Sequence, residues 1–432
     1  MTTTHRYGAQ TATMLVVASM IGTGVYTTSG LLVRDLGSPG LVLLAWLVGG
    51  VLSLAGALSY AELSAALPES GGEYALLSRI YHPAVGFVAG VVSLVVGFAA
   101  PIAACAIAFA RYLEQVVPGV PQTPTAIAIV LGSSLAHALS SSASVRAQDA
   151  LTWLKLGLAL SLAVVGAIAM PEGGWQTITL DAAGIATPAF ALGVVQVSFA
   201  YTGWNAATYV AGELHRPERT LPIALIAGTT IVTALYVALN AVFVAGAPPD
   251  ELRGAIEVAD VSARALLGPG AARLVSSTIA LGLVSTVGAF VVTGARVWTA
   301  MGTDHPALGV VARRTARGTP GVALALQAAL ACVMVLTSSF DLLLGTVGFA
   351  LSISSGLTVV GVFVLRRRRP DLPRPYRALG HPITPILYVA LVAWTVIESL
   401  RAEPAIAIAG VASVLVGLGG YVVLTRIPRK NA

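Results

Sequence analysis

Long apolar runs recur along the whole chain and are separated by short polar connections. Most runs are on the order of 20 residues or longer, the length at which an α-helix crosses the hydrocarbon core of a bilayer. Backbone groups in lipid must be hydrogen-bonded within the protein, so these runs predict helices rather than strands. We count about twelve such runs: residues 11–34, 40–66, 84–112, 123–140, 147–170, 187–213, 220–246, 272–300, 320–338, 342–365, 382–400 and 404–425.

The composition leads to the same class of protein. Of the 432 residues, 56% are hydrophobic and 10% are charged, whereas soluble domains carry roughly 25% charged residues. The mean hydropathy is +0.85. The longest connection between runs, residues 247–270, has about a quarter of the length of a typical domain. We therefore expect an all-α membrane protein that forms a single transmembrane domain over residues 1–432.

The positive charges predict the orientation of this domain. The net charge of +6 does not indicate a nucleic-acid partner, because the basic residues are spread over alternate connections. Such alternation is the positive-inside pattern, and it predicts a multi-pass protein of the cytoplasmic (inner) membrane with both termini in the cytoplasm. We interpret Arg366–Arg369 as a topology anchor, with a lipid-headgroup or partner site as the alternative. The pattern comprises His5, Arg6, Arg79, Arg146, Arg216, Arg219, Arg313, Arg314, Arg317, Arg366–Arg369, Arg426, Arg429 and Lys430.

The sequence contains none of the common motifs of enzymatic chemistry. It lacks a dinucleotide fingerprint, a phosphate-binding loop, a zinc-protease helix and a serine-hydrolase elbow. Cys105 and Cys332 lie inside apolar runs and are read as small core residues, without the spacing of a zinc site or a disulfide. His137 is read as a packed or hydrogen-bonded histidine rather than a catalytic one. We expect no enzyme activity, no metal and no cofactor.

Two of the apolar runs are interrupted near their middle. Gly22, Thr23 and Gly24 weaken the first run as a helix, since each glycine costs about 1 kcal/mol relative to alanine. Gly203 and Asn205 interrupt the sixth run. Close helix packing on small residues is the alternative interpretation of either interruption alone. The interruptions, like the runs that follow them, are about 180 residues apart, and paired broken helices are typical of a transporter with an inverted repeat.

The ends of broken helices suit an amino acid. The N–H groups at Thr23, Gly24 and Val25 begin a new half-helix and attract a carboxylate. The carbonyl groups that end the preceding half-helices, around Met20 and Ile21 and around Phe199 and Ala200, attract an ammonium group. One zwitterion satisfies both sets. Phe199, Trp204 and Phe98 are candidates to bound the side-chain pocket, although packing is the more common role of aromatic residues in such helices.

Four motifs occur in consistent order over roughly residues 10–365. They are Ile21-Gly22-Thr23-Gly24-Val25-Tyr26; Tyr60-Ala61-Glu62-Leu63 with Pro68, Gly71, Gly72 and Tyr74; Phe199-Ala200-Tyr201 with Gly203-Trp204-Asn205, Glu213, Pro217, Arg219, Leu221 and Pro222; and Ser285-Thr286 with Gly288, Thr293 and Arg296. Together they resemble the amino acid–polyamine–organocation (APC) transporter superfamily. The Gly-Trp-Asn form is most similar to its L-type amino acid transporter branch.

This resemblance implies a five-plus-five inverted-repeat fold of the LeuT type, with discontinuous helices 1 and 6 and a moving bundle of helices 1, 2, 6 and 7. The repeats are expected at about 11–170 and 187–365, with two additional helices at about 382–425. The resemblance also implies carboxylate contacts at Thr23 and Gly24, and amine contacts to the carbonyls of Met20, Phe199, Ala200 and Thr202. The full expected substrate site is Met20, Ile21, Gly22, Thr23, Gly24, Phe199, Ala200, Tyr201, Thr202 and Trp204.

Lys155 is the most unusual charged residue. It lies about nine residues, or roughly 13 Å, inside the fifth run. A lysine at that depth costs about 2.5–3.5 kcal/mol and usually faces the bundle interior, and snorkelling to the interface is the alternative. Several members of the superfamily have lysine where sodium-coupled relatives bind sodium. We expect Lys155 to approach the first-helix carbonyls near Ser19 and the Ser285 hydroxyl, and to couple a proton to transport, so no sodium site is favoured.

The remaining expectations concern substrate and partners. Because no other ionisable side chain lies mid-span near the interruptions, we predict a neutral L-amino acid as substrate. Exchange of amino acids, transport of a polyamine or other organic amine, a channel, and a sensor without transport are the alternatives. Glu62 and Glu213 are expected to pair with loop arginines, and Pro101 to kink the third helix. Apart from the bilayer and the substrate, no obligate protein partner is evident.

Overall fold

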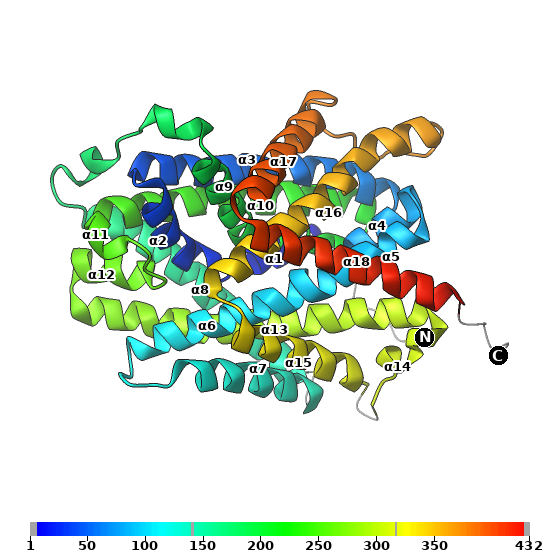
Figure 1. The fold of residues 1–432 in the computed structure, drawn as a ribbon, viewed down its shortest axis with the longest axis horizontal. Helices are drawn as coiled ribbons and strands as arrows, with labels where there is room; N and C mark the ends of the chain where they lie inside the picture. The colour runs from blue at the N-terminus through cyan, green and yellow to red at the C-terminus, as the bar shows by residue number, and fades with distance from the viewer. Residues whose placement is uncertain (1–6, 140–141, 316–317, 427–432) are drawn as a thin grey trace.

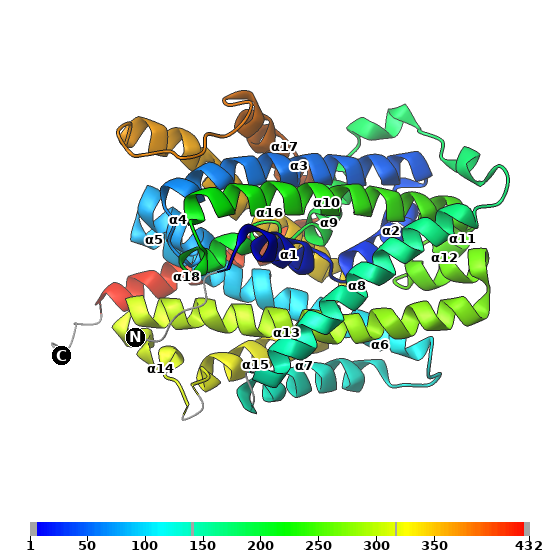
Figure 2. The same ribbon diagram turned by 180° about the vertical axis from the view of Figure 1, so that it is seen from behind.

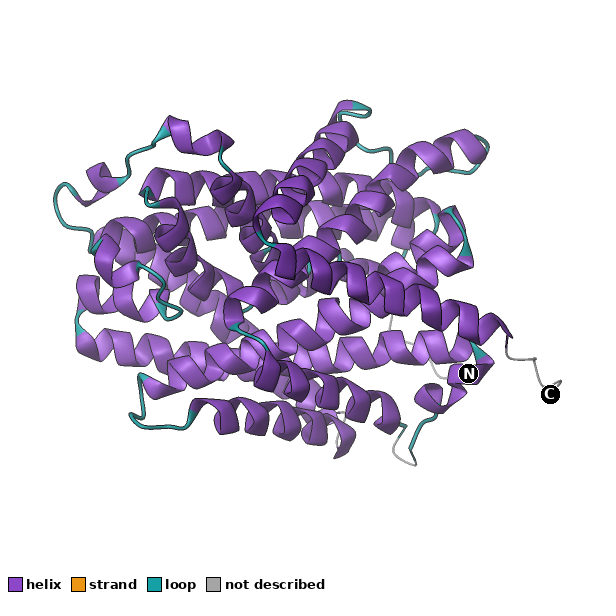
Figure 3. Cartoon of the chain, in the orientation of Figure 1, coloured by secondary structure: helices purple, strands orange, loops and turns teal. Residues whose placement is uncertain are grey.

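The computed structural model describes residues 7–139, 142–315 and 318–426, and every secondary-structure element in these ranges is a helix (Figures 1 and 3). Eight helical segments among them are long and apolar enough to cross a membrane, and three shorter apolar helices accompany them. The chain is therefore a multi-pass helical membrane protein. The predicted number of twelve spans stays a prediction. His5, Arg6, Arg317, Arg429, Lys430 and the side chain of Arg146 lie outside the described residues.

The first half of the chain contains a helix that stops and restarts. After α1 (Ala9–Met20) the helix resumes as α2 (Gly24–Leu36). The elements that follow are α3 (Pro39–Ala66), the short α4 (Gly72–Ile80), α5 (Pro83–Val92), a π-helix (Ser93–Ala99), α6 (Ala100–Glu114), α7 (Gln122–Leu139) and α8 (Ser142–Ile168).

The second half repeats this arrangement of a broken helix followed by a long one. The helix α9 (Pro188–Ala200) is followed, after a gap, by the 3₁₀-helix η4 (Ala206–Glu213) and then by α10 (Pro217–Gly246). The later elements are α11 (Pro249–Leu252), α12 (Val258–Leu267), α13 (Pro269–Asp304), α14 (Gly309–Ala312), α15 (Gly321–Thr337), α16 (Phe340–Arg368), α17 (Ile383–Ala402) and α18 (Pro404–Arg426).

Local sequence signals explain where several helices begin. Ser38 and Thr187 accept hydrogen bonds from the backbone N–H groups of Leu41 and Phe190, and each precedes a proline in the first turn of α3 or α9. A hydroxyl cap satisfies an N–H group that the helix leaves unpaired, and proline in the first turn has no N–H group to lose. The starts of these two helices are therefore encoded locally.

The third span is irregular where a proline was expected to bend it. The π-helix at Ser93–Ala99 lies directly before Pro101, which occupies the first turn of α6. A proline ring cannot donate to the preceding turn, and a π-helix is a common way to absorb such a mismatch. The irregularity thus begins about two turns before the proline itself, and Ser93 and Gly97 of this segment lie on the wall of the cavity described below.

The broken helices lie in the middle of the molecule. Helices α3 and α10 run side by side and α1 packs against α10, while α13 passes below them against α6 and α8 (Figure 2). The largest cluster of buried apolar residues includes residues of α1, α3, α6, α9, α10 and α13, so both interruptions are enclosed by the core. The long helices therefore form a frame around two short, irregular segments.

Candidate functional site

The first interruption lies between Met20 and Gly24. α1 ends at Met20, residues 21–23 are not helical, and α2 starts at Gly24. The N–H groups in the first turn of a helix lack partners within that helix, so the start of α2 presents donors at this point. The hydroxyl of Thr23 is buried and has no hydrogen-bond partner among the described residues. The first interruption therefore occurs where the sequence predicts it, with an unsatisfied hydroxyl beside it.

The second interruption spans residues 201–205. α9 ends at Ala200, and Gly203 adopts a φ of 99°, a backbone conformation that favours glycine. The chain continues as a 3₁₀-helix rather than an α-helix after Asn205. The carbonyl of Phe199 accepts bonds from the N–H group and the hydroxyl of Thr202 at 3.0 and 2.7 Å. One of the carbonyls expected to meet an ammonium group is thus bonded within the interruption itself.

The two interruptions pack against each other. A Cβ atom on Gly24 would lie 2.5 Å from Cα of Ala200, and one on Gly203 would lie 2.7 Å from the carbonyl oxygen of Ser19. Both distances are far shorter than a carbon can approach, so both positions require glycine because of backbone contact. The glycines that weaken the helices therefore also bring the two interruptions together.

Lys155 approaches the first interruption from α8. Its Nζ donates to the carbonyl of Ile21 at 3.0 Å, to that of Ala18 at 3.5 Å and to the hydroxyl of Thr286 at 3.2 Å. The side chain is 5% exposed, so it does not snorkel to an interface. Gly282 of α13 leaves room for its methylene stem, since a Cβ atom there would lie 2.7 Å from Lys155 Cγ. Ser285, the predicted hydroxyl, is buried next to Thr286 on α13.

Other side chains also occupy the carbonyl ends. Tyr236 of α10 donates its hydroxyl to the carbonyl of Met20. Tyr201 donates to the carbonyl of Trp46 on α3 at 3.0 Å, which ties the start of the second interruption to that helix. The carbonyls of Met20, Ile21 and Phe199 therefore all have protein donors in this structure.

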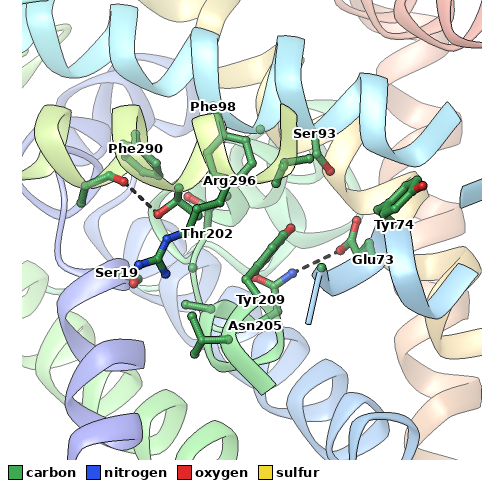
Figure 4. Close-up of a pocket in the computed structure, with 18 of the residues that line it drawn as sticks. Ser19, Glu73, Tyr74, Ser93, Phe98, Thr202, Asn205, Tyr209, Phe290 and Arg296 are labelled. Atoms are coloured by element: carbon green, nitrogen blue, oxygen red, sulfur yellow. Dashed lines mark hydrogen bonds between the residues drawn. The ribbon is translucent and has the colours of Figure 1, made fainter. Parts of the chain in front are cut away.

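A cavity of about 730 Å³ is lined by residues of both interruptions (Figure 4), and its lining continues to the connection between α14 and α15. Of the ten predicted substrate residues, Thr202 and Trp204 line it, together with Phe98, while the other eight do not contribute to the lining. The backbone neighbours Ser19 and Gly203 do. The cavity thus meets both interruptions at Ser19 and at residues 202–205, and the predicted carboxylate donors lie behind this surface.

The cavity extends to one end only. Its lining includes Arg314 and Thr319 in the connection between α14 and α15, but no described residue of α2, α11 or α12. At that opposite end Arg34 pairs with Asp341 at 2.9 Å, and the N–H of Gly254 donates to the carbonyl of Gly30 at 2.7 Å. The molecule is therefore closed on the side of α2, α11 and α12, and the cavity lies on the side of α14 and α15.

The predicted ion pairs of Glu62 and Glu213 are present. Glu62 is fully buried and accepts from Arg366 at the end of α16 and from the backbone N–H of Ala378, with Arg374 at 3.7 Å. Glu213 lies 3.9 Å from Arg296, and this pair is half exposed at the cavity wall. Arg296 belongs to α13 rather than to a loop, which corrects the predicted partner: the arginine already lies inside the predicted run 272–300, and only the packing of α13 against the second interruption shows that it reaches Glu213.

Three further side chains, those of His137, Glu73 and Asn205, line the cavity. His137 lines the wall, and its Nδ1 bonds the carbonyl of Ser133 at 2.8 Å, as a packed histidine does. Glu73 and Asn205 were not predicted as site residues, yet they form a hydrogen bond in the wall of the cavity (Figure 4). Glu73 escaped notice because its short helix lies between apolar runs, where an acidic residue is ordinary.

Comparisons with known proteins give the family of this chain. A family model described as amino acid permease matches residues 7–420. The mouse (Mus musculus) large neutral amino acids transporter small subunit 2 is 31% identical, over 96% of this chain and 80% of its own length. The mouse Asc-type amino acid transporter 1 is 28% identical, over 98% and 79%. The cystine/glutamate transporter of Pongo abelii is 28% identical, over 96% and 82%.

Proposed function

Because this chain belongs to the amino acid permease family of the APC superfamily, we propose that it moves a neutral L-amino acid across the cytoplasmic membrane by alternating access. Its family and its relatives are transporters and not enzymes, and its relatives are named for amino acids. Amino acid transport is accordingly the activity of this family, and the neutral substrate and the coupling are the parts that we propose.

The contact between the two interruptions is the observation that carries this proposal. Gly203 meets Ser19 at the head of the cavity, and Gly24 meets Ala200 directly behind that surface. A helix start and two helix ends therefore converge on one small volume, with N–H donors for a carboxylate and carbonyls for an ammonium group. The carbonyls now held by Tyr236, Lys155 and Thr202 become available to the substrate only if these donors move, which suits a cycle of two states.

A neutral substrate is supported by the charges of the cavity wall. Glu213 already faces Arg296, and the carboxylate of Glu73 accepts hydrogen bonds from three neutral side chains, including Tyr60 and Asn205. A cationic substrate would need a carboxylate that is not already bonded in this way. Free lysine or arginine as a substrate would have to recruit the carboxyl group of Glu73. The substrate panel therefore includes both of these cationic amino acids.

Proton coupling through Lys155 is the second part of the proposal. Its ammonium group donates hydrogen bonds to the carbonyls of Ile21 and Ala18 at the first interruption. Loss of its proton would remove the positive charge and weaken these hydrogen bonds. A cation at this position replaces one that would otherwise be bound from solution, so no sodium requirement is expected. If Lys155→Ala retains the wild-type pH dependence of uptake in proteoliposomes, or if the wild type requires sodium, this part is wrong.

We also propose the membrane architecture that the sequence predicts. Twelve spans, a five-plus-five inverted repeat with two additional helices and cytoplasmic termini are supported by the paired broken helices and by the basic connections. In this orientation the cavity opens to the cytoplasm. The absence of an obligate protein partner stays a prediction, because the mouse relative is named as a small subunit.

Uptake by purified protein in liposomes tests the function directly. A panel of labelled neutral, cationic and acidic amino acids and a polyamine is measured with and without an inward proton gradient, and with and without unlabelled substrate inside. We expect uptake of neutral amino acids that the proton gradient increases. Uptake that occurs only with internal substrate identifies an exchanger instead, and uptake of the polyamine alone identifies an amine transporter.

A further inference from the structure

Glu73 differs from the other buried acidic residues of the described chain. Glu62 and Asp260 are each buried and each pair with an arginine, Arg366 and Arg264 respectively. Glu73 is 2% exposed, and none of the described lysine, arginine or histidine side chains lies within ion-pair distance of it. A buried ionisable group in a membrane protein without a counter-charge is costly, and it is normally retained for a function.

Three neutral side chains from three different elements surround this carboxylate. Tyr60 of α3 donates to Oε1 at 2.6 Å, Asn205 donates to the same oxygen at 3.2 Å, and Ser354 of α16 donates to Oε2. The dashed line in Figure 4 marks the contact with Asn205. Through these three hydrogen bonds the carboxyl group of Glu73 on α4 joins α3, α16 and the end of the second interruption.

Asn205 gives the cluster its connection to the transport site. It is the last residue of the second interruption, two residues after Gly203, whose backbone touches Ser19 of α1. Tyr201 fixes the start of the interruption to α3 through the carbonyl of Trp46, while Asn205 fixes its end to α4 through Glu73. The five residues between α9 and η4 are therefore tied at one end to a backbone carbonyl of α3 and at the other end to the side chain of Glu73 on α4.

We propose that Glu73 is a positioning residue of the transport site, which holds Asn205 and thereby keeps the second interruption in its substrate-binding conformation. This inference rests on the proposed function, since it takes the interruption as the place where substrate binds. Glu73 acts through Asn205 and does not itself contact the substrate. Its loss therefore weakens the binding of every substrate by the same factor.

Substitutions of Glu73 and Asn205 in the purified transporter test this role. Glu73→Ala removes the acceptor and leaves Asn205 and Tyr60 unsatisfied, and we expect KM to rise about tenfold for all transported amino acids. Asn205→Ala has the same effect, and the double variant stays within about twofold of either single variant, because each substitution alone already removes the contact between Glu73 and Asn205. Vmax per folded transporter changes little, whereas a merely structural defect would reduce Vmax.

A conservative variant and a matched control accompany these measurements. In Glu73→Gln the amide oxygen accepts from Tyr60 and Asn205, and the amide nitrogen can donate to Ser354, so KM stays within about threefold of the wild type. Glu69→Gln changes an exposed carboxylate on the same connection, which pairs only with Arg79 at 3.0 Å, and it leaves KM unchanged. If Glu73→Ala is not recovered as a monodisperse protein, Glu73→Asp replaces it in the cycle with Asn205→Ala.

Each other outcome has a distinct meaning. Additive effects of the two alanine variants on KM show that Glu73 does not act through Asn205 and overturn the inference. A change in KM for cationic or polar substrates alone makes Glu73 a direct ligand and overturns it as well. A wild-type protein that moves no member of the amino acid panel contradicts the proposed function itself, whatever the variants do.

Discussion

The two interruptions are built from the same kind of sequence but are held in different ways. The first is held from a distance: Lys155 of α8 and Tyr236 of α10 donate to the carbonyls of Ile21 and Met20. The second bonds its own carbonyl, since Thr202 donates to Phe199, and only its ends are tied to the frame. The first interruption therefore depends on neighbouring helices for its hydrogen bonds, and the second largely does not.

The difference extends to charge. A buried lysine, Lys155, lies at the first interruption, and a buried glutamate, Glu73, lies at the end of the second. Among the described residues neither pairs with an opposite charge. Two segments with one task can thus be tested separately, because each has its own ionisable residue.

Removing the cation from the first interruption should have the largest effect. Lys155→Met keeps the methylene stem that packs on Gly282 but leaves the carbonyls of Ile21 and Ala18 without their donor. A buried acceptor that loses a charged partner costs about 1.5–3 kcal/mol, so we expect initial uptake to fall by about 10- to 150-fold. The measurement is the initial rate of uptake into proteoliposomes at equal protein content.

A second substitution on the same helix controls for damage to α8. Gly157 has no atom within 4 Å of the position that a Cβ would occupy, so Gly157→Ala should leave uptake within about twofold of the wild type, because a surface substitution rarely exceeds 0.5 kcal/mol. Equal losses in Lys155→Met and Gly157→Ala would mean that α8, and not the ammonium group, supports the first interruption.

The contact between the interruptions should give the next largest effect. Gly203→Ala introduces a Cβ atom 2.7 Å from the carbonyl of Ser19 at a φ of 99°, so it meets both a clash and a strained backbone. We expect a loss of about 2 kcal/mol or more, seen as a lower melting temperature in detergent and about a tenfold or larger loss of uptake. Gly132→Ala, in open space on α7, serves as the control.

A result for Gly203→Ala like that for Gly132→Ala would contradict the packing of the two interruptions. Gly24→Ala sharpens the comparison, because its Cβ would lie 2.5 Å from Ala200 at a helical position without a strained φ. Uptake in Gly24→Ala measures the clash alone. The excess loss in Gly203→Ala then measures the backbone strain of the second interruption.

Features that depend on local sequence were predictable. The glycines at 22, 24 and 203 weaken a helix wherever they occur in an apolar run, so both interruptions appear in the sequence and in the structure. Lys155 was predictable for a similar reason, because a charge far inside an apolar run needs a partner, and the carbonyls of α1 supply it. A single segment sufficed for the interruptions and for the burial of Lys155, whereas the carbonyls of the first helix as its partners followed from the resemblance to the superfamily.

Contacts between distant segments were not predictable. Glu73 and Asn205 are 132 residues apart, and Tyr236 lies 216 residues from Met20. Neither Glu73 nor Tyr236 is unusual in its own segment, so only the packing of the helices shows that each bonds an interruption. The cavity follows the same rule. Its lining includes Ser19 and Asn205, flanking residues whose exposure depends on how the half-helices are tilted rather than on their composition.

The smallest expected effects come from removing one hydroxyl group at each interruption. At the first interruption the hydroxyl belongs to a distant helix, and at the second it belongs to the interruption itself. Tyr236→Phe removes a donor that the first interruption receives from another helix, and the buried carbonyl of Met20 loses its partner. We expect a cost of about 1 kcal/mol and about a fivefold loss of uptake.

Thr202→Val removes the hydroxyl that bonds Phe199, but the N–H group of Thr202 still donates to the same carbonyl at 3.0 Å. Its loss of uptake should therefore stay below about twofold. A larger effect from Thr202→Val than from Tyr236→Phe would reverse the comparison, because it would mean that the cavity-facing hydroxyl of Thr202 serves the substrate rather than the backbone of the second interruption.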